Sequence, residues 1–188
     1  MNYLAHFHLA RGDDDWIVGA LLGDYIKGPL SSELPSRLRH GIQLHRRIDA
    51  FTDTHLLRCE FARHLPDSYR RYAGIVLDVC CDHWLSMHWL QFETKSLSDF
   101  SGHVYGVLQN NLMQMPEPVA RMAQRLVEHD VLMQYHDVVV VAATLKRIGW
   151  RLRSDNPLRC IDAEFAEYLA AAEPVFNELY PELLTQFE

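Results

Sequence analysis

The chain lacks long apolar runs. No window approaches the roughly 18 uninterrupted apolar residues that a membrane span needs, although 48% of its 188 residues are hydrophobic. It also lacks a basic leader, and His6 and His8 interrupt the apolar stretch of its first residues, MNYLAHFHLARGDDD. We therefore expect no signal peptide, no membrane association and a cytoplasmic location.

Cysteines are few, and no two of them form a C-x-x-C pair, which argues against a structural zinc site. The four are Cys59, Cys80, Cys81 and Cys160. Adjacent Cys80 and Cys81 cannot easily bridge each other, and both lie in an apolar run. We expect reduced, buried thiols in a cytosolic protein.

Positive charge is scarce as well. The formal net charge of −7 argues against general nucleic-acid binding, which requires a broadly basic surface. Residues 36–72 are an exception, because they contain eight arginines and four acidic residues, a local formal charge of +4. Such a segment can receive an acidic partner or a phosphate, or it can consist of arginines scattered over solvated helices.

Internal repeats, low-complexity segments and linkers are also missing. The length suits one well-buried domain, and the apolar periodicity is helical almost throughout, so we predict a single all-α domain over residues 1–188. Valine-rich residues 137–149 have a β-like composition, but Ala142 and Ala143 continue the run and Gly149 stands where a C-cap would. The expected helices include 41–51, 69–92, 118–134, 137–149 and 161–180, the last ending at Pro181.

The stretch VLDVCCDHWL places ionisable side chains inside an apolar helix. Asp78 and Asp82 are four residues apart and therefore lie on one side of that helix. Two buried carboxylates at this spacing repel each other unless a cation or a proton compensates, and a divalent metal ion would do so. His83 lies about 100° round the helix from Asp82 and can join the same site only beside a cleft.

Three further segments supply candidate metal ligands. In LHRRIDAFTDTH, His45 and Asp49 are four residues apart on one helix face, an arrangement common in metal-dependent hydrolases. Asp24 follows Gly23 in ALLGDYIKG, where we expect a helix to end, and its alternative role is a turn cap. Of His6 and His8, which face nearly opposite ways on a helix, at most one can join a common site, and we select His6.

Two adjacent His-Asp pairs, in EHD (128–130) and YHD (135–137), have the composition of an HD hydrolase dyad. Few other candidate ligands surround them, so we interpret them as surface residues beside a bend. Trp84, Trp89 and Tyr72 are interpreted as core residues rather than as a platform for substrate.

Four ordered motifs, NYLAHFHLA, GALLGDYIKG, GIQLHRRIDAFTDTH and RRYAGIVLDVCCDHWL, resemble those of bacterial acyl-carrier-protein phosphodiesterases. The resemblance covers about residues 1–90. It implies an α-helical fold distantly related to the HD phosphatase and phosphodiesterase group, and removal of 4′-phosphopantetheine from holo-acyl carrier protein to give the apo-protein. It also implies a divalent cation, typically Mn²⁺, with Mg²⁺ or another ion as alternatives.

Under this resemblance the motif residues take roles in a phosphodiesterase site. A metal-activated water would attack phosphorus, and the serine oxygen of the carrier protein would leave. Asp24, His45 and Asp78, with His6, are the expected metal ligands. Asp82 is a further candidate, His83 the candidate acid, and Asp49 would hold His45 or the water. The motif reads Asp-His where HD enzymes read His-Asp, so roles cannot be copied from them.

Acyl carrier proteins are small and strongly acidic, so a basic rim beside the metal would steer them toward it. The residues expected to contact the phosphate or the carrier protein are Arg46, Arg47, Arg70 and Arg71. Two alternatives remain open: an HD-like phosphohydrolase of a nucleotide or another small phosphoester, and a non-catalytic helical module that binds acidic proteins.

Overall fold

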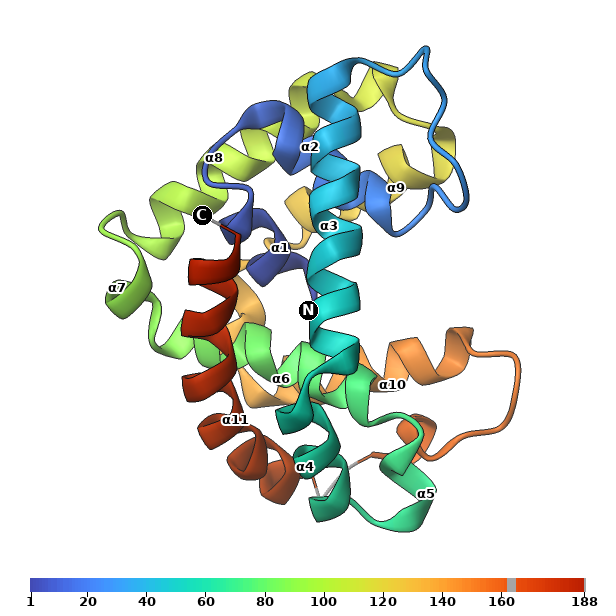
Figure 1. The fold of residues 1–188 in the computed structure, drawn as a ribbon, viewed down its shortest axis with the longest axis vertical. Helices are drawn as coiled ribbons and strands as arrows, with labels where there is room; N and C mark the ends of the chain where they lie inside the picture. Colours follow the sequence, from blue (N-terminus) through green and yellow to red (C-terminus); the bar gives the residue numbers. More distant parts are fainter. Residues whose placement is uncertain (162–164, 188) are drawn as a thin grey trace. The chain divides into compact units, whose positions relative to one another are not determined.

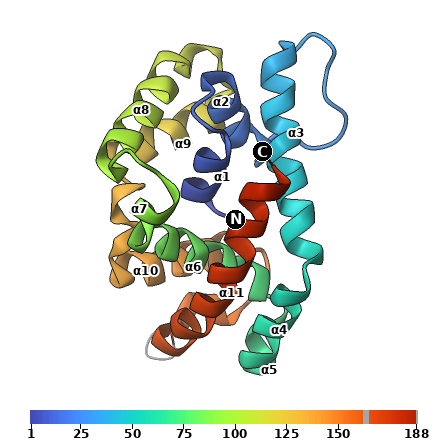
Figure 2. The same ribbon diagram turned by 60° about the vertical axis from the view of Figure 1, so that its left-hand side comes forward.

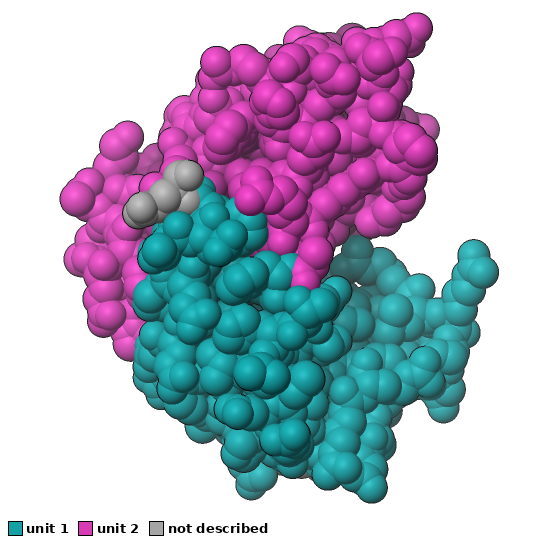
Figure 3. Space-filling model, viewed as in Figure 1, with its two compact units in different colours: residues 1–2, 51–87, 134–188 teal, residues 3–50, 88–133 magenta. Residues whose placement is uncertain are grey.

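A computed structural model describes residues 1–161 and 165–187, and within these ranges the regular structure is entirely helical. The all-α prediction is confirmed. The chain forms two compact units, coloured separately in Figure 3. Unit 1 comprises residues 1–2, 51–87 and 134–188, and unit 2 comprises residues 3–50 and 88–133. We describe each unit by itself.

Unit 2 is built on the first two helices and on the pair α8 and α9 (Figure 1). Helix α2 packs against α1, α8 and α9. The division between the units falls within α3, after Ala50. The helices that contribute to unit 2 are α1 (Tyr3–Leu9), α2 (Asp14–Gly23), most of α3 (Ser36–Thr54), α7 (Trp89–Phe92), α8 (Leu97–Asn110) and α9 (Glu117–Glu128).

The sequence explains how α2 begins and how closely it approaches α3. Asp13 caps the helix, because its side chain accepts a hydrogen bond from the Trp16 amide. A Cβ atom on Gly19 would stand 2.7 Å from the Cα of Gly41, and one on Gly41 would stand 2.7 Å from the Cα of Trp16. The two glycines therefore allow the backbones of α2 and α3 to touch.

Unit 1 is built around α6 (Ala73–Met87), the helix that contains the candidate Asp-His motif. Three helices pack against α6: α4 (Leu56–His64), α10 (Val138–Arg151) and α11 (Phe165–Gln186), as Figures 1 and 2 show. Cys80 and Cys81 are fully buried there, and desolvation raises the pKa of both thiols. Cys59 and Cys160 are exposed, so the expectation of buried thiols holds only for the adjacent pair.

The predicted helix 69–92 is wrong as a single element. The chain turns at Tyr72, whose amide donates to the Tyr69 carbonyl, and again at His88. It forms α5 (Asp67–Arg70), α6 and α7 instead. After the second turn the Trp89 ring packs at 4.8 Å from the Phe100 ring of α8. Tertiary packing thus decides where this apolar run breaks. Tyr72 and Trp89 are buried as expected, and Trp84 is half-buried.

Three other boundaries differ from the prediction. Helix α9 ends at Glu128 rather than near 134, because the chain enters the left-handed region at Asp130 (φ 45°). Gly149 lies inside α10 and is not its C-cap. Helix α11 continues through Pro181 to Gln186, because Tyr180 and Leu183 on either side of the proline are both buried. The predicted start of that helix, 161–164, includes residues 162–164, which lie outside the described residues.

The helix predicted over 137–149 is confirmed as α10, so the alanines and the helical pattern prevail over the valine-rich composition. Within the described ranges, no helix combines the length and apolarity required to cross a membrane.

Candidate metal centre

Two histidines and one carboxylate meet inside unit 2. The Nε2 atoms of His6 and His45 lie 3.1 Å from the Oδ1 and Oδ2 atoms of Asp49, respectively. The two imidazole rings stack with their centroids 4.0 Å apart. Both histidines are buried, and one ligand atom from each of the three residues lies within 4.8 Å of the others.

The helices explain this convergence. His45 and Asp49 are one turn apart on α3, as their spacing predicts. His6 comes from α1 and points to this pair, whereas His8 turns away toward Trp89 and Glu93. The expectation that only one of the two α1 histidines faces this cluster is therefore met.

A glycine at the end of α2 makes room for the His45 ring. A Cβ atom on Gly23 would lie 2.4 Å from both Cγ and Cδ2 of His45, far inside van der Waals contact. Gly23 is thus a positioning residue for the imidazole, a role that the sequence interpretation missed. The glycines of GALLGD and GIQLH were the available signal, since Gly19 and Gly41 also bring α2 onto α3.

Asp24 stands next to this cluster at the end of α2. Its Oδ1 lies 3.7 Å from His45 Nε2, and 47% of its side chain remains exposed. Desolvation raises the pKa of Asp24, and the charge of Asp49 raises it further, while His45 lowers it. Asp24 is therefore a candidate fourth donor beside this group of three, in a position where two carboxylates repel each other without a cation.

The charge states of the other residues are set by burial and hydrogen bonding. Burial lowers the pKa of His6 to about 3, although the hydrogen bond that His6 donates to Asp49 opposes this shift. Burial would raise the pKa of Asp49, but hydrogen bonds from His45 and His6 hold it well below its usual range. At neutral pH His6 is therefore neutral and Asp49 ionised, which are the forms that bind metal ions.

The donor set suits a divalent ion of intermediate hardness. It joins imidazole nitrogen to carboxylate oxygen, a combination accepted by first-row transition metals. Neighbouring ligands around an octahedral ion with bonds of about 2.1 Å are about 3.0 Å apart, close to the 3.1 Å separations between the imidazoles and Asp49. The Nδ1 atoms of both histidines are buried without a hydrogen-bond partner, so packing and Asp49 orient these rings.

The candidates of the VLDVCCDHWL motif lie on α6, in unit 1. Asp82 is completely buried, at 0% exposure. The Asp78 side chain is 34% exposed, and its carboxylate pairs at 2.9 Å with the α-amino group of Met1. The expectation of two buried carboxylates is thus correct for Asp82, whereas Asp78 is half-buried. The structure brings together the four candidates of unit 2, which are His6, Asp24, His45 and Asp49. The candidates Asp78, Asp82 and His83 lie on α6 in unit 1.

His83 is buried on α6, and its Nδ1 lies 2.8 Å from the carbonyl oxygen of Tyr135. A carbonyl accepts but cannot donate, so Nδ1 donates its hydrogen to Tyr135. Such a hydrogen bond from one ring nitrogen fixes the orientation of the imidazole. The role of proton donor expected for His83 stays a prediction.

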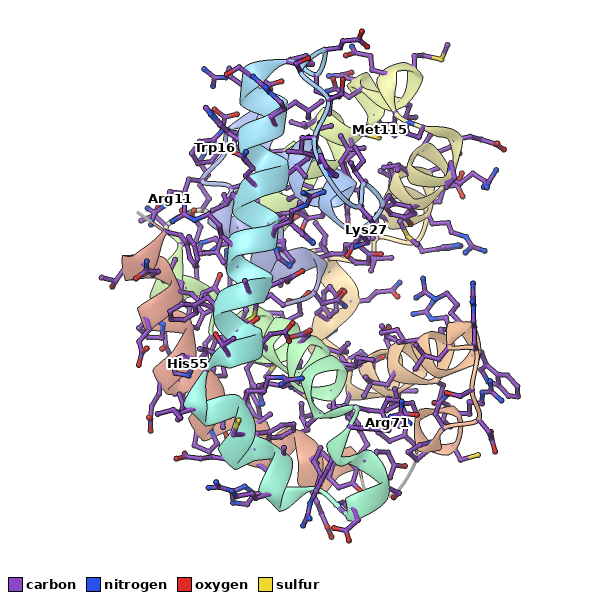
Figure 4. The ribbon with its side chains drawn as sticks, turned by 45° about the vertical axis from the view of Figure 1, so that its right-hand side comes forward. Arg11, Trp16, Lys27, His55, Arg71 and Met115 are labelled. Atoms are coloured by element: carbon purple, nitrogen blue, oxygen red, sulfur yellow. The ribbon has the colours of Figure 1, made fainter. Side chains whose placement is uncertain are left out.

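The four candidate arginines lie in different surroundings. The Arg46 guanidinium donates to the carbonyls of Ile26 (2.6 Å) and Gly28 (2.8 Å), and so holds the loop that follows Asp24. Figure 4 labels Lys27 on the same loop; its ammonium donates to the Gly23 carbonyl.

Arg47 is exposed on α3. Arg70 pairs with Asp67 and donates to the Leu65 carbonyl. Arg71 is exposed, and its guanidinium lies 5.2 Å from the centroid of the Tyr72 ring.

The two adjacent His-Asp pairs, in EHD and YHD, lie at helix ends, in agreement with their interpretation as residues beside a bend. The Asp137 carboxylate accepts from the Val139 amide and caps α10. His129 is the C-cap of α9, followed by Asp130 in its left-handed conformation.

Two imidazoles and a carboxylate that face one another form a donor set that occurs in metal-dependent hydrolases, among other metalloproteins. The family described as acyl carrier protein phosphodiesterase matches residues 1–183. The chain therefore belongs to the acyl carrier protein phosphodiesterase family, as its motifs indicated.

Curated relatives agree with this assignment. A protein of Photorhabdus laumondii named acyl carrier protein phosphodiesterase is 33% identical over 100% of this chain and 96% of its own. Proteins of the same name from Yersinia pestis (31%; 99% and 97%) and Pectobacterium atrosepticum (29%; 98% and 96%) are similar over their whole lengths. No solved structure matches the chain.

Proposed function

We propose that the protein hydrolyses the phosphodiester that links 4′-phosphopantetheine to a serine of holo-acyl carrier protein, giving the apo-protein. The observation that carries this proposal is the full-length relationship to proteins named acyl carrier protein phosphodiesterase. The cluster of His6, His45 and Asp49 adds an independent chemical reason, because phosphodiester hydrolysis is commonly assisted by a divalent ion.

The metal in this proposal is Mn²⁺, with Mg²⁺ as an alternative, held by His6, His45, Asp49 and Asp24. When bound, such an ion supplies charge stabilisation at phosphorus and lowers the pKa of a coordinated water. The chain's own part is to keep His6 neutral by burial and to keep Asp49 ionised through two imidazole hydrogen bonds. Asp24 lies on the exposed side, where a substrate phosphate can approach.

Hydrolysis adds the oxygen of water to phosphorus, breaks the bond between phosphorus and the serine oxygen, and delivers one proton to that oxygen. Without a cation, desolvation and Asp49 raise the pKa of Asp24, and a bound divalent ion would relieve this repulsion. Asp78, Asp82 and His83 on α6 keep the roles expected from the motif as predictions. The hydrogen bond of His83 to Tyr135 fixes the orientation of its ring.

A comparison of substrates tests the proposal. Purified protein with Mn²⁺ is offered holo-carrier protein, a set of nucleotide phosphoesters and bis(4-nitrophenyl) phosphate. We expect apo-carrier protein and free 4′-phosphopantetheine, with the highest kcat/KM for the carrier protein. Preferential hydrolysis of a nucleotide would support the HD-like alternative, and hydrolysis of none of them would support the non-catalytic binding module.

A further inference from the structure

The outer face of α10, in unit 1, combines exposed apolar side chains with basic ones. Val141, Leu145 and Gly149 are buried, and α10 packs against α6. On the opposite side of the helix Val139 is 75% exposed and Trp150 is 68% exposed. Because residues at i, i+4 and i+11 share a helix face, Ala143, which is also exposed, lies between them.

Basic residues border this apolar stripe. Residues 138–160 contain five basic residues and one acidic residue, a formal charge of +4 in a chain whose net charge is −7. Arg147, Arg151 and Arg153 are exposed. Helix α5 contacts the 3-10 segment η3 (Pro157–Cys160), where the Tyr69 hydroxyl donates to the Pro157 carbonyl. Arg71, labelled in Figure 4, follows α5 and extends the basic border.

The exposed tryptophan is held in place by its surroundings. The Arg159 guanidinium lies 4.9 Å from the centroid of the Trp150 ring. Arg159 itself is fixed, because it donates to the carbonyls of Gly149 (3.2 Å) and Leu152 (3.1 Å) and pairs with Asp155 (3.2 Å). A rigid, exposed aromatic side chain loses little entropy on binding, and tryptophan and arginine dominate the energetics of protein interfaces.

The loop that provides Arg159 depends on a close contact with α10. A Cβ atom on Gly149 would lie 2.9 Å from the Arg159 amide nitrogen. The buried Asn156 amide donates to the carbonyls of Gly149 and Ser154. The loop from Leu152 to Cys160 therefore packs closely against the end of the helix and places Arg159 beside the Trp150 ring.

We propose that this face, defined by Val139, Ala143, Arg147, Trp150 and Arg151 and called the α10 face below, is the docking surface for an acidic carrier protein. The inference rests on the proposed function for the identity of the partner. The charge of the face complements a strongly acidic protein, and the apolar stripe gives that partner's helix a surface to cover. The α10 face thus takes the part first expected for Arg46, which is occupied with its own loop.

The test compares carrier-protein kinetics with small-substrate kinetics in the full-length protein. The variants are Trp150→Ala and the double charge reversal Arg147→Glu/Arg151→Glu. Arg125→Glu on α9 is the matched control, since this arginine is exposed in the other unit. We expect about a tenfold or larger increase in KM for holo-carrier protein in both α10 variants, with kcat unchanged. Hydrolysis of bis(4-nitrophenyl) phosphate should not change, and neither should either reaction of the control.

A binding experiment separates this inference from the proposed function. Apo-carrier protein has no phosphodiester, so its titration into the protein, followed by calorimetry, reports docking alone. We expect binding that weakens with salt and is lost in the double reversal. Wild-type binding that both α10 variants retain would overturn the docking surface even if hydrolysis is confirmed. If the wild type binds apo-carrier protein and the α10 variants do not, but the wild type hydrolyses no substrate, the docking surface stands and the proposed function is rejected.

Other occupants of the α10 face would be recognised in the same experiments. Binding of duplex DNA or of anionic phosphatidylserine vesicles that depends on Trp150, without carrier binding, would contradict the proposal. A sedimentation mass that falls from dimer to monomer in Trp150→Ala would assign the face to a second copy of this chain instead. Circular dichroism of each variant checks that the helical fold is intact.

Discussion

Replacing Gly23 by alanine tests how the fold positions the proposed metal centre. The added Cβ would stand 2.4 Å from Cγ and Cδ2 of His45 and 2.8 Å from its Cβ. Carbon atoms in contact are normally about 3.5–4.0 Å apart, so the imidazole or the end of α2 must move by more than about 1 Å. Metal–ligand distances tolerate only about 0.2 Å, and His45 Nε2 would be carried away from Asp49 and Asp24.

Two opposing effects set the stability of Gly23→Ala. Overpacking costs about 1–3 kcal/mol, and the higher helix propensity of alanine returns about 0.5–1 kcal/mol. We therefore expect the free energy of unfolding to fall by about 0–2.5 kcal/mol, which leaves the protein folded. The affinity for Mn²⁺, measured by electron paramagnetic resonance titration, should fall by about 10- to 100-fold or more, by analogy with losses caused by misplaced ligands.

Gly102→Ala on α8 is the matched control. Nothing lies within 4 Å of the Cβ that this substitution adds, and the residue is inside a helix. We expect about 0.5–1 kcal/mol of added stability and an unchanged Mn²⁺ affinity. If Gly23→Ala bound Mn²⁺ as tightly as the wild type and the control, the argument that Gly23 positions a metal-binding His45 would be refuted.

Three further predictions concern the same unit. Asp49→Asn should lower Mn²⁺ affinity by at least about 100-fold in the titration above, whereas an unchanged affinity would remove Asp49 from the metal centre. Arg46→Lys should increase amide hydrogen exchange in the loop after Asp24, because an ammonium cannot reproduce the forked bonds to Ile26 and Gly28; unchanged exchange would contradict a clamp. In metal-free protein, the free energy of unfolding should rise between about pH 3 and pH 6.5, because the unfolded chain binds a proton at His6 that the folded one excludes. The slope from His6 is at most about 1.4 kcal/mol per pH unit, and denaturant titrations of wild type and His6→Gln that show the same slope would contradict it.

Local patterns in the sequence were sufficient to predict the all-α class and the convergence of His45 with Asp49. The i, i+4 spacing of His45 and Asp49 places both side chains on one face of a helix in any context. The same rule separates His6 from His8 on α1, and the structure indeed turns them toward different partners. These predictions depended on neighbouring residues only, so they did not require knowledge of the tertiary fold.

Features set by tertiary packing could not be predicted in this way. The break at His88 arises where the chain turns to pack Trp89 against Phe100, and the apolar pattern continues both across it and across the earlier break at Tyr72. Pro181 fails to end α11 because buried residues on both sides of it keep the helix packed. The ion pair of Asp78 with the α-amino group of Met1 joins residues that lie far apart in the sequence.

The α10 face was missed for a related reason. Residues 138–160 match no familiar motif, and a valine-rich helix with a tryptophan reads as core. Only the packing of Val141 and Leu145 inward shows that Val139 and Trp150 point outward. The fixed position of Arg159 beside Trp150 likewise depends on the loop contacts with Gly149.

The intact mass of holo-carrier protein reports whether the protein removes 4′-phosphopantetheine in a metal-dependent reaction. Holo-carrier protein is incubated with metal-depleted wild-type protein, with and without added Mn²⁺, and with Asp49→Asn under the same conditions. We predict that the carrier loses the mass of its 4′-phosphopantetheine arm only with wild-type protein and Mn²⁺. An unchanged carrier mass in every reaction would contradict the proposed function, and equal loss without any divalent ion would contradict the metal centre.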